Sequence, residues 1–429
     1  MANNFTNTRK VAMKALDSYE NELEVLSGFN TDWAAEFNKG EQKIGDYLLV
    51  RWPYRWQVVD GAALNKQPMD DQFSQIRVDR HKQIGWDVTK WDEALNVDDL
   101  YKRCFETQIL QMANEGDDDA CKFAYQNTNM IQGTLGTYPA SLTDAQSQML
   151  FAMAKLKAMG CHKMDEIRAV LSPWQSANSQ AYTNQQFNSQ AILAAQYRTG
   201  KLQDAFGFNR ILTDQNIRSH QSGTFVGTPQ IANGNSAADG ALSLVTSGWT
   251  AGDTLFTGDV IGVAGTQPVN PVNRRVPSIP TANNGLLLPL VITQDFVAVG
   301  AGGNDTIYVS VGGSAYSLRG PGQYQNCDAL PAAGSLITVW PGTTSPSGKA
   351  GVQGLAFGPD AFAYVPIAFR DPSKDGAWGA TVRDPKTGMS LTLSKQYQIG
   401  QFGTDARIDM GYGLAPLWTM TDSVRLVGA

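Results

Sequence analysis

The chain has 429 residues, a formal net charge of −6 and a pI near 5.2, which argues against a dedicated nucleic-acid binder, since such proteins show a basic excess. Charged residues make up 17% of the chain, below the ~25% of an average soluble protein, and aromatic residues make up 10%. This balance indicates that much of the surface ends up against other protein.

The cysteines and the apolar runs predict a protein that is made and kept in a reducing cytoplasm. No two of the four cysteines are close enough for a CxxC pair (Cys104, Cys121, Cys161 and Cys327). The longest apolar run, residues 286–292, contains a proline and is far shorter than the ~20 residues that span a bilayer. No apolar leader is visible at the start of the chain, so we expect neither secretion nor membrane association.

Residues 1–38 are predicted to form a helical arm, because apolar residues recur at helical spacing until Asn38, Lys39 and Gly40 end the pattern. Residues 39–93 are predicted to form a long β-hairpin. Apolar residues alternate along 46–60, and a second alternating run returns at 73–88 after a polar tip at 61–72.

The predicted hairpin has a face that it cannot bury alone, and an isolated two-stranded hairpin is marginal in water. We therefore expect it to lie mostly on a neighbouring subunit, with its arginines meeting acids of another chain or of another part of the assembly. Seven residues are the candidate assembly contacts: Arg51, Trp52, Tyr54, Arg55, Trp56, Arg77 and Arg80.

Residues 94–140 are predicted to hold the longest helix, over 97–125, with Asn96 as its cap and Asp99 as a capping-box acid. Residues 141–222 are predicted to hold a second helix at 143–159, a short strand at 168–172 and a strand-turn-strand at 206–220.

At about residue 222 the composition shifts to Gly, Thr, Ser, Asn and Pro, and short β runs replace the helical stripes. This pattern predicts an inserted all-β domain over 223–355 that folds on its own, followed by a return to mixed character with two strands over 356–429. The predicted fold class is α+β.

The sequence carries none of the common catalytic signatures. The three histidines (His81, His162 and His220) lie in different segments, and no HExxH or GxSxG motif occurs. The stretch 342–349 has one residue too many for a phosphate loop, and Gly300 to Asp305 resembles a calcium turn that occurs only once. The acidic run at 115–119 fits a solvated helix face or an intersubunit salt-bridge patch better than a metal site. We expect no catalytic residue, cofactor or metal.

Several stretches resemble the coat proteins of tailed bacteriophages of the Hong Kong ninety-seven type, and more closely the P-twenty-two-like coat proteins. Phe206-Gly207-Phe208, with Asp214 to Ile217 and His220, resembles the family's stretch before its insertion. Gly258 to Gly265 with Val269-Asn270-Pro271 resembles the first strand pair of the insertion. Lys395-Gln396-Tyr397, Arg407 to Gly413 and Val424-Arg425-Leu426 resemble the closing strands. The order of predicted elements matches over nearly the whole chain.

The resemblance implies the tailed-phage major capsid fold, with an N-arm (1–38), an E-loop (39–93), a spine helix and P-domain (94–140), and an A-domain (141–222) that returns with the final P-domain strands (356–429) around the insertion. It implies the major capsid protein of a short-tailed phage, a podovirus, in the virion and assembled in the host cytoplasm. Its partners would be copies of itself in pentamers and hexamers, a scaffolding protein, a portal protein, with or without a decoration or cement protein, and weakly bound double-stranded DNA. The alternatives are a nanocompartment subunit with the same fold and, in another class, a β-rich carbohydrate-active enzyme.

Overall fold

The computed structural model describes residues 16, 23–34, 47–56, 58–62, 64, 66–67, 69, 71–89, 100–183, 206–278, 287–300, 303–313, 316–340, 347–375, 378–383 and 389–428. The chain divides into two compact units. Unit 1 comprises residues 1–50, 75–120 and 363–415, and unit 2 comprises residues 51–74, 121–362 and 416–429. The predicted α+β class is confirmed by the mixture of helices and strands in both units.

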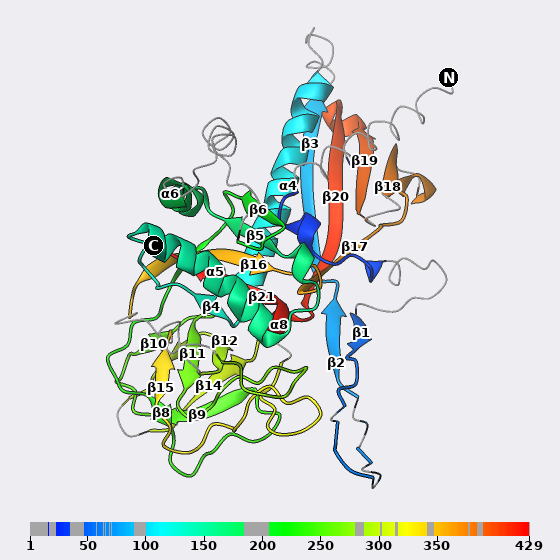
Figure 1. Cartoon of the computed structure of the whole chain (residues 1–429). Helices are drawn as coiled ribbons and strands as arrows, with labels where there is room; N and C mark the ends of the chain where they lie inside the picture. Colours follow the sequence, from blue (N-terminus) through cyan, green and yellow to red (C-terminus); the bar gives the residue numbers. More distant parts are fainter. Residues whose placement is uncertain are drawn as a thin grey trace, which may run out of the picture. The chain divides into compact units, whose positions relative to one another are not determined.

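Unit 1 pairs a long helix with an antiparallel sheet (Figure 1). The helix α4 (Leu100–Asn127) confirms the predicted long helix, although Asn96 and Asp99 lie outside the described residues. The sheet has the order β17 (Phe362–Ile367), β20 (Gly403–Pro416), β19 (Ser390–Gln398) and β18 (Trp378–Arg383). Along β20, Ala406, Ile408, Met410 and Tyr412 are buried, and Tyr412 donates a hydrogen bond of 2.7 Å to Asp119 of α4. One face of the sheet therefore packs on the helix.

The predicted long hairpin is much shorter in the structure. Among the described residues of the hairpin, β1 (Tyr47–Arg51) and β2 (Phe73–Arg77) are the strands that pair with each other. The rest of the returning run forms β3 (Arg80–Thr89), which pairs with β20 from Arg80 opposite Tyr412 to Thr89 opposite Gly403. The alternation in the sequence predicted a strand correctly, but its partner lies more than three hundred residues away and leaves no local signal.

The N-terminal arm differs from the predicted helix over residues 23–33, whereas Leu16 and Ala34 are helical. Residues 23–34 contain a short 3-10 helix, η1 (Leu26–Gly28), and Asn30 forms an isolated parallel bridge to Ala363. The Asp117 side chain of α4 accepts hydrogen bonds of 2.9 Å from the backbone N–H groups of Glu24 and Leu26. These contacts hold the chain in an irregular path along unit 1.

Unit 2 contains the second predicted helix, α5 (Leu142–Met159). Ser141 caps it by accepting a hydrogen bond from the Asp144 N–H, and Gly160 ends it in the left-handed conformation at φ 82°. The other helices are α6 (Pro173–Thr183), α8 (Thr419–Asp422) and the 3-10 turns η2 (Met164–Glu166), η3 (Pro372–Asp375, in unit 1) and η4 (Ile399–Gln401, in unit 1). A sheet lies beside α5, in the order β4 (Ile131–Gln132), β21 (Ser423–Val427), β16 (Ala350–Phe357), β5 (Arg168–Leu171) and β6 (Arg210–Thr213), and β7 (Ser219–Gln221) also pairs with β16.

The insertion is rich in strands, as predicted. Six strands form one sheet in the order β15 (Ile337–Val339), β11 (Val260–Val263), β12 (Pro289–Ile292), β14 (Asp305–Ser310), β9 (Ser243–Ser247) and β8 (Gln230–Ile231). Strands β10 (Thr254–Leu255) and β13 (Phe296–Val297) form a separate pair. The predicted boundary at residue 355 falls inside β16, because β16 pairs with β5, β7 and β21 and belongs to the other sheet of unit 2.

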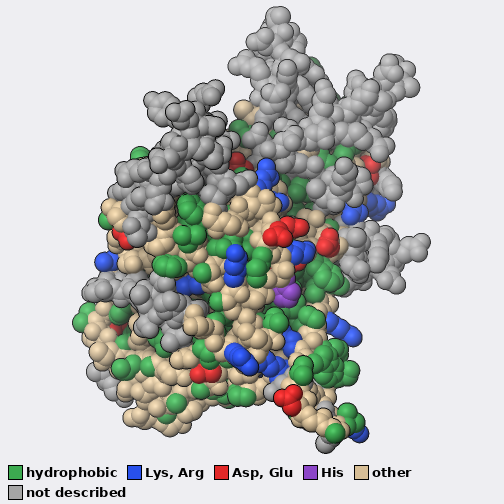
Figure 2. All heavy atoms as spheres, viewed as in Figure 1, with side chains coloured by type: hydrophobic (Ala, Val, Ile, Leu, Met, Phe, Trp, Pro, Cys, Tyr) green, Lys and Arg blue, Asp and Glu red, His purple; other side chains and the backbone are tan. Residues whose placement is uncertain are grey.

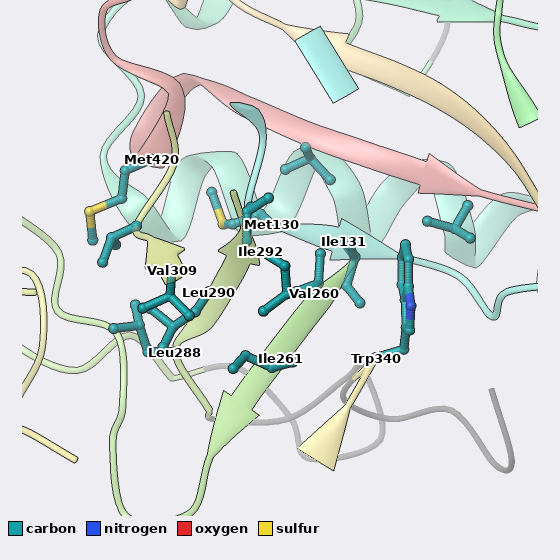
Figure 3. Packing of buried hydrophobic residues seen from close by; sticks show 14 of the residues in the cluster. Met130, Ile131, Val260, Ile261, Leu288, Leu290, Ile292, Val309, Trp340 and Met420 are labelled. Atoms are coloured by element: carbon teal, nitrogen blue, oxygen red, sulfur yellow. The ribbon is translucent and has the colours of Figure 1, made fainter. Parts of the chain in front are cut away.

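A single hydrophobic cluster joins the insertion to the rest of unit 2 (Figure 3). Val260 and Ile292 of the insertion point toward Met130 and Ile131, which come directly after α4. The cluster also takes in Leu156 of α5 and Leu426 of β21. A β domain that folds independently would have a core of its own, so this shared core does not support the expectation that residues 223–355 fold alone.

Buried charges lie at the same junction. The Arg425 side chain donates 2.7 Å hydrogen bonds to the backbone carbonyls of Thr128 and Gly258, and its guanidinium lies 5.8 Å from the ring centres of Tyr125 and Trp340. Burial lowers the pKa of Arg425 to about 9, while Tyr125 and Asp259 act in the opposite direction. The group is therefore charged at neutral pH.

Candidate assembly surface

The candidate assembly residues begin at the base of an extended arm, residues 51–72, which belongs to unit 2. The half-buried Trp52 stacks on Tyr316 with ring centres 4.5 Å apart, and its indole N–H donates a 2.8 Å hydrogen bond to the Ser74 hydroxyl. Tyr324 meets the same indole edge-on at 5.8 Å, and Trp418 lies 6.2 Å away. Trp52 therefore anchors the arm to its own chain, where we had expected an intersubunit contact.

Arg55 continues this anchor. Its guanidinium lies 5.7 Å from the centre of the Trp418 ring, and its carbonyl accepts a 2.9 Å hydrogen bond from Arg274. Burial lowers the pKa of the Arg55 guanidinium. Arg51 is exposed at the end of β1. Arg55 was predicted to meet an acid of another chain or of another part of the assembly, and in the structure its guanidinium contacts the Trp418 ring of its own chain.

Beyond the anchor, the arm turns its apolar side chains to solvent. Trp56 is 53% exposed, and its ring lies 6.1 Å from that of Tyr54, whose hydroxyl donates to Asp71. Val58 is 93% and Leu64 83% exposed. Figure 2 shows hydrophobic side chains at the surface along this arm, at the lower right of the view. The arm presents an apolar surface that the described part of its own chain leaves open.

The remaining two candidates lie in unit 1. Arg77 is exposed at the end of β2. The Arg80 guanidinium lies 3.7 Å from the Asp119 carboxylate, which also lies 3.0 Å from the Lys82 ammonium. Burial opposes ionisation of Asp119, but hydrogen bonds from Tyr412 and Lys82 outweigh it and lower the pKa of this carboxyl. Arg80 therefore meets an acid of its own chain, because β3 lies beside α4 in the same unit.

The acidic run also has a structural role in unit 1. Glu115 and Asp119 bind Lys82, and Asp117 holds the N-terminal segment. Within the described residues, no group of three or more His, Cys, Asp or Glu side chains is placed to hold a metal. Asp305, the last residue of the stretch that resembles a calcium turn, is buried as the first residue of β14 and lies opposite Thr246 of β9 in the sheet.

The histidines also pair with acids. His220 lies 2.9 Å from the buried Asp259, and His162 lies 3.8 Å from Asp422. His81 lies 2.8 Å from Asp409, which Arg407 also binds, in an open pocket of about 820 Å³ on the sheet of unit 1. His81 and Asp409 are thus held with Arg407 in one ion-pair cluster, and Asp87, Lys395 and Asp405 also line the pocket.

The residues that sequence reasoning missed are the aromatic partners of the arm. Tyr316, Tyr324 and Trp418 lie in loops more than two hundred residues after Trp52, in segments without a periodic pattern. Nothing in the local sequence distinguishes them from other aromatic residues. Among the described helices, none is both long and apolar enough to cross a membrane.

No family model and no curated protein matches the chain. Solved structures similar to it include that of Mycobacterium phage Che8, with 12% identity, a TM-score of 0.47, and coverage of 94% of this chain and 90% of that one. The capsid structure of cyanophage P-SCSP1u has 12% identity and a TM-score of 0.42, with 90% and 84% covered. A virus-like particle from Pyrococcus furiosus has 7% identity and a TM-score of 0.38, with 98% of both chains covered.

Proposed function

We propose that this chain is the major capsid protein of a short-tailed bacteriophage, a subunit that assembles with copies of itself into an icosahedral shell around double-stranded DNA. The observation that carries the proposal is the arm of residues 51–72. It is anchored at Trp52 and exposes Trp56, Val58 and Leu64 along an extended chain. Large exposed apolar surfaces mark sites of protein association.

The rest of the chain supports the same role. Most of the 28-residue helix α4 lies in unit 1 beside an antiparallel sheet, and such a rigid element suits a shell that must keep its shape. The long helix α4, the second helix α5 and the strand-rich segment after them follow one another in the order on which the sequence resemblance to phage coat proteins rests. The expected partners remain a scaffolding protein, a portal protein, with or without a decoration protein, and the enclosed DNA.

The test is assembly of the full chain, expressed in bacteria with the scaffolding protein of the same genome, followed by gradient sedimentation and electron microscopy. The wild-type chain is expected to give closed shells. The variant Trp56→Ser should remain soluble, because this side chain is exposed, but should give at least tenfold fewer shells. Trp174, which is 77% exposed at the start of α6, provides the matched control Trp174→Ser, expected to assemble normally.

Two results would count against the proposal. Absence of closed shells from the wild-type chain would exclude the capsid role. Normal shells from Trp56→Ser would show that the exposed arm is not an assembly contact. Shells that contain a cargo enzyme in place of DNA would favour the nanocompartment alternative.

A further inference from the structure

Two loops of the insertion reach the base of the arm, and the first of them is residues 269–275. Its Arg274 guanidinium donates a hydrogen bond of 2.9 Å to the Arg55 carbonyl of the arm and one of 3.4 Å to the Gln323 carbonyl of the insertion. Arg274 and Arg55 lie 219 residues apart in the sequence. A side chain of the insertion thus holds the backbone of the arm directly.

The second loop, residues 316–327, contacts both halves of the arm. Its Tyr316 stacks on Trp52 of the outgoing half, with ring centres 4.5 Å apart. Its Arg319 guanidinium donates a hydrogen bond of 3.3 Å to the side-chain oxygen of Gln72 in the returning half. Together with the first loop, these contacts attach the arm to the insertion at three separate points. We call the two loops the bracket.

The backbone of the first loop shows that it is shaped to present Arg274. This residue has a φ of 54°, in the left-handed region that glycine adopts readily and other residues avoid. The Asn270 carbonyl accepts a 2.8 Å hydrogen bond from the Arg274 N–H and so closes the turn. The Asn270 side chain accepts from the Val272 N–H at 2.8 Å and donates to the Ala158 carbonyl of α5 at 2.7 Å. Residues in such sparsely populated conformations persist where the surrounding structure fixes them, and they cluster at functional sites.

The second loop is fastened from within in a similar way. The buried Asn326 side chain accepts a 2.8 Å hydrogen bond from the Arg319 N–H and donates one of 2.8 Å to the Ser317 carbonyl. Both loops therefore keep their shape through hydrogen bonds of their own asparagines. A segment that is bound at several points to loops of fixed shape leaves them in one direction.

We propose that the bracket sets the direction of the arm, and that Arg274 is its positioning residue. The inference rests on the proposed function, in which the outer part of the arm is an assembly contact. An isolated two-stranded arm is marginal in water, so it needs a support outside itself to keep one direction. The insertion supplies that support from segments more than two hundred residues away in the sequence.

A fixed direction matters because the outer arm must meet its partner with a defined surface. Trp56, Val58 and Leu64 lie beyond the bracket, and all three are exposed. Ordering a flexible segment at the moment of association opposes binding, and a segment that is already ordered avoids this entropic cost. The bracket therefore favours assembly without itself contacting the partner.

The direction of the arm can be measured in the free full-length subunit by pulsed electron paramagnetic resonance. Spin labels are attached to L64C in the outer arm and to V226C in the insertion, where both native side chains are 83% exposed. The labelled chain also carries C104S, because the other three cysteines are buried. It should give one narrow distribution of distances. R274G removes the guanidinium while glycine accepts the positive φ, so the melting temperature should hold and the distribution should become at least twice as wide.

Two further variants make the test specific. R319M removes the hold on Gln72 through the second loop and should widen the distribution independently. R275A changes the adjacent, exposed arginine and is the matched control, expected to keep the narrow distribution. In the assembly experiment described above, without labels, R274G and R319M should each reduce the yield of shells at least tenfold, whereas R275A should give the wild-type yield.

Narrow distributions in both R274G and R319M would overturn the inference while leaving the proposed function intact. Wide distributions with wild-type yields of shells would show that assembly does not depend on the direction of the arm, and would also overturn it. Failure of the proposed function shows differently, as an absence of shells from the wild-type chain. The distance measurement does not require shells, so it would still decide whether the bracket directs the arm.

Discussion

The buried Asp259 side chain holds three parts of the insertion together and also contacts His220, which lies just before the insertion. One carboxylate oxygen lies 2.9 Å from His220 Nε2 and 3.0 Å from Trp340 Nε1. The other accepts backbone N–H groups of Gly223 and Phe256 at 3.1 and 2.8 Å. A fully buried carboxylate with four donors is a stable arrangement only while all of the donors remain.

Asp259→Asn should lower the free energy of unfolding of the soluble subunit by roughly 3 kcal/mol, because an amide cannot accept from all four donors and because the negative charge that favours protonated Arg425 is lost. Urea denaturation at neutral pH measures this change. Asp239→Asn is the control, since the Asp239 side chain is 57% exposed and its contact with Arg319 is worth at most about 1 kcal/mol. Equal effects from the two substitutions would contradict the role given to Asp259.

Lys155 gives a residue-level prediction that depends on pH. Its ammonium is buried and donates a 2.7 Å hydrogen bond to the Ile131 carbonyl, and burial lowers its pKa from 10.5 to about 7. Between these two pH values the unfolded chain binds more protons at this residue than the folded chain does, so its contribution to stability rises with pH. Below pH 7 both states are protonated and the destabilisation is at its full value.

Lys155→Met should therefore change stability relative to the wild type in a pH-dependent way. The difference in unfolding free energy, variant minus wild type, should fall by roughly 1 kcal/mol per pH unit between pH 7 and 10 and should be flat below pH 6. Denaturation curves at intervals over pH 5–10 measure it. Lys157→Met, on the exposed side of α5, should show no such slope. A flat difference for Lys155→Met would show that this group is hydrated in the folded protein.

At the scale of elements, the arm has two parts with different roles. Trp52→Ala should lower the melting temperature of the free subunit, because it removes the stacking on Tyr316 and the hydrogen bond to Ser74, at a cost of about 3 kcal/mol. Trp56→Ala should leave that temperature unchanged. Differential scanning calorimetry of the two variants distinguishes the roles, and equal melting temperatures would contradict the anchor at Trp52.

The insertion gives a second prediction at this scale. Expressed alone, residues 223–349 should lack a cooperative thermal transition, because Val260 and Ile292 would face water where Met130 and Ile131 cover them in the full chain. Circular dichroism and dispersion of the amide spectrum measure it, with the full chain as the control. A sharp transition in the isolated segment would restore the autonomous domain that the composition suggested.

The same elements show how far sequence reasoning reaches. Periodicity placed α4 and α5 within a few residues of their bounds, because this signal is local. The alternation at 80–88 identified a strand, but not β20 as its partner. Likewise, the tryptophans of the arm were singled out, yet only the fold separates Trp52, packed on Tyr316, from the exposed Trp56. Long-range pairing depends on the whole chain, and no window of sequence contains it.

At the scale of the whole molecule, a shell protein must enclose DNA without binding it tightly. The net charge of −6 provides no broad basic excess, and phosphate contacts require lysine or arginine in numbers. We expect the unassembled subunit to bind duplex DNA no more tightly than ~10⁻⁶ M at physiological salt, the range of ordinary non-specific affinity. Fluorescence anisotropy with a labelled duplex measures it. Substantially tighter binding would favour a true nucleic-acid-binding protein over a container.

The two ends of the insertion meet in one ladder, since Gln221 of β7 pairs with Ala350 of β16. Evolution could therefore lengthen, shorten or exchange everything between them with little change in loop-closure entropy for the rest of the chain. The shared core opposes that freedom, because any replacement must still cover Met130 and Ile131 and receive the Arg425 side chain at the position of the Gly258 carbonyl. We therefore expect sequence variation among related chains to be small on the face of the insertion that covers Met130 and Ile131 and larger on the strands that face outward. Chimaeras that exchange the insertion together with residues 130, 131 and 425 should fold, whereas chimaeras that exchange the insertion alone should not.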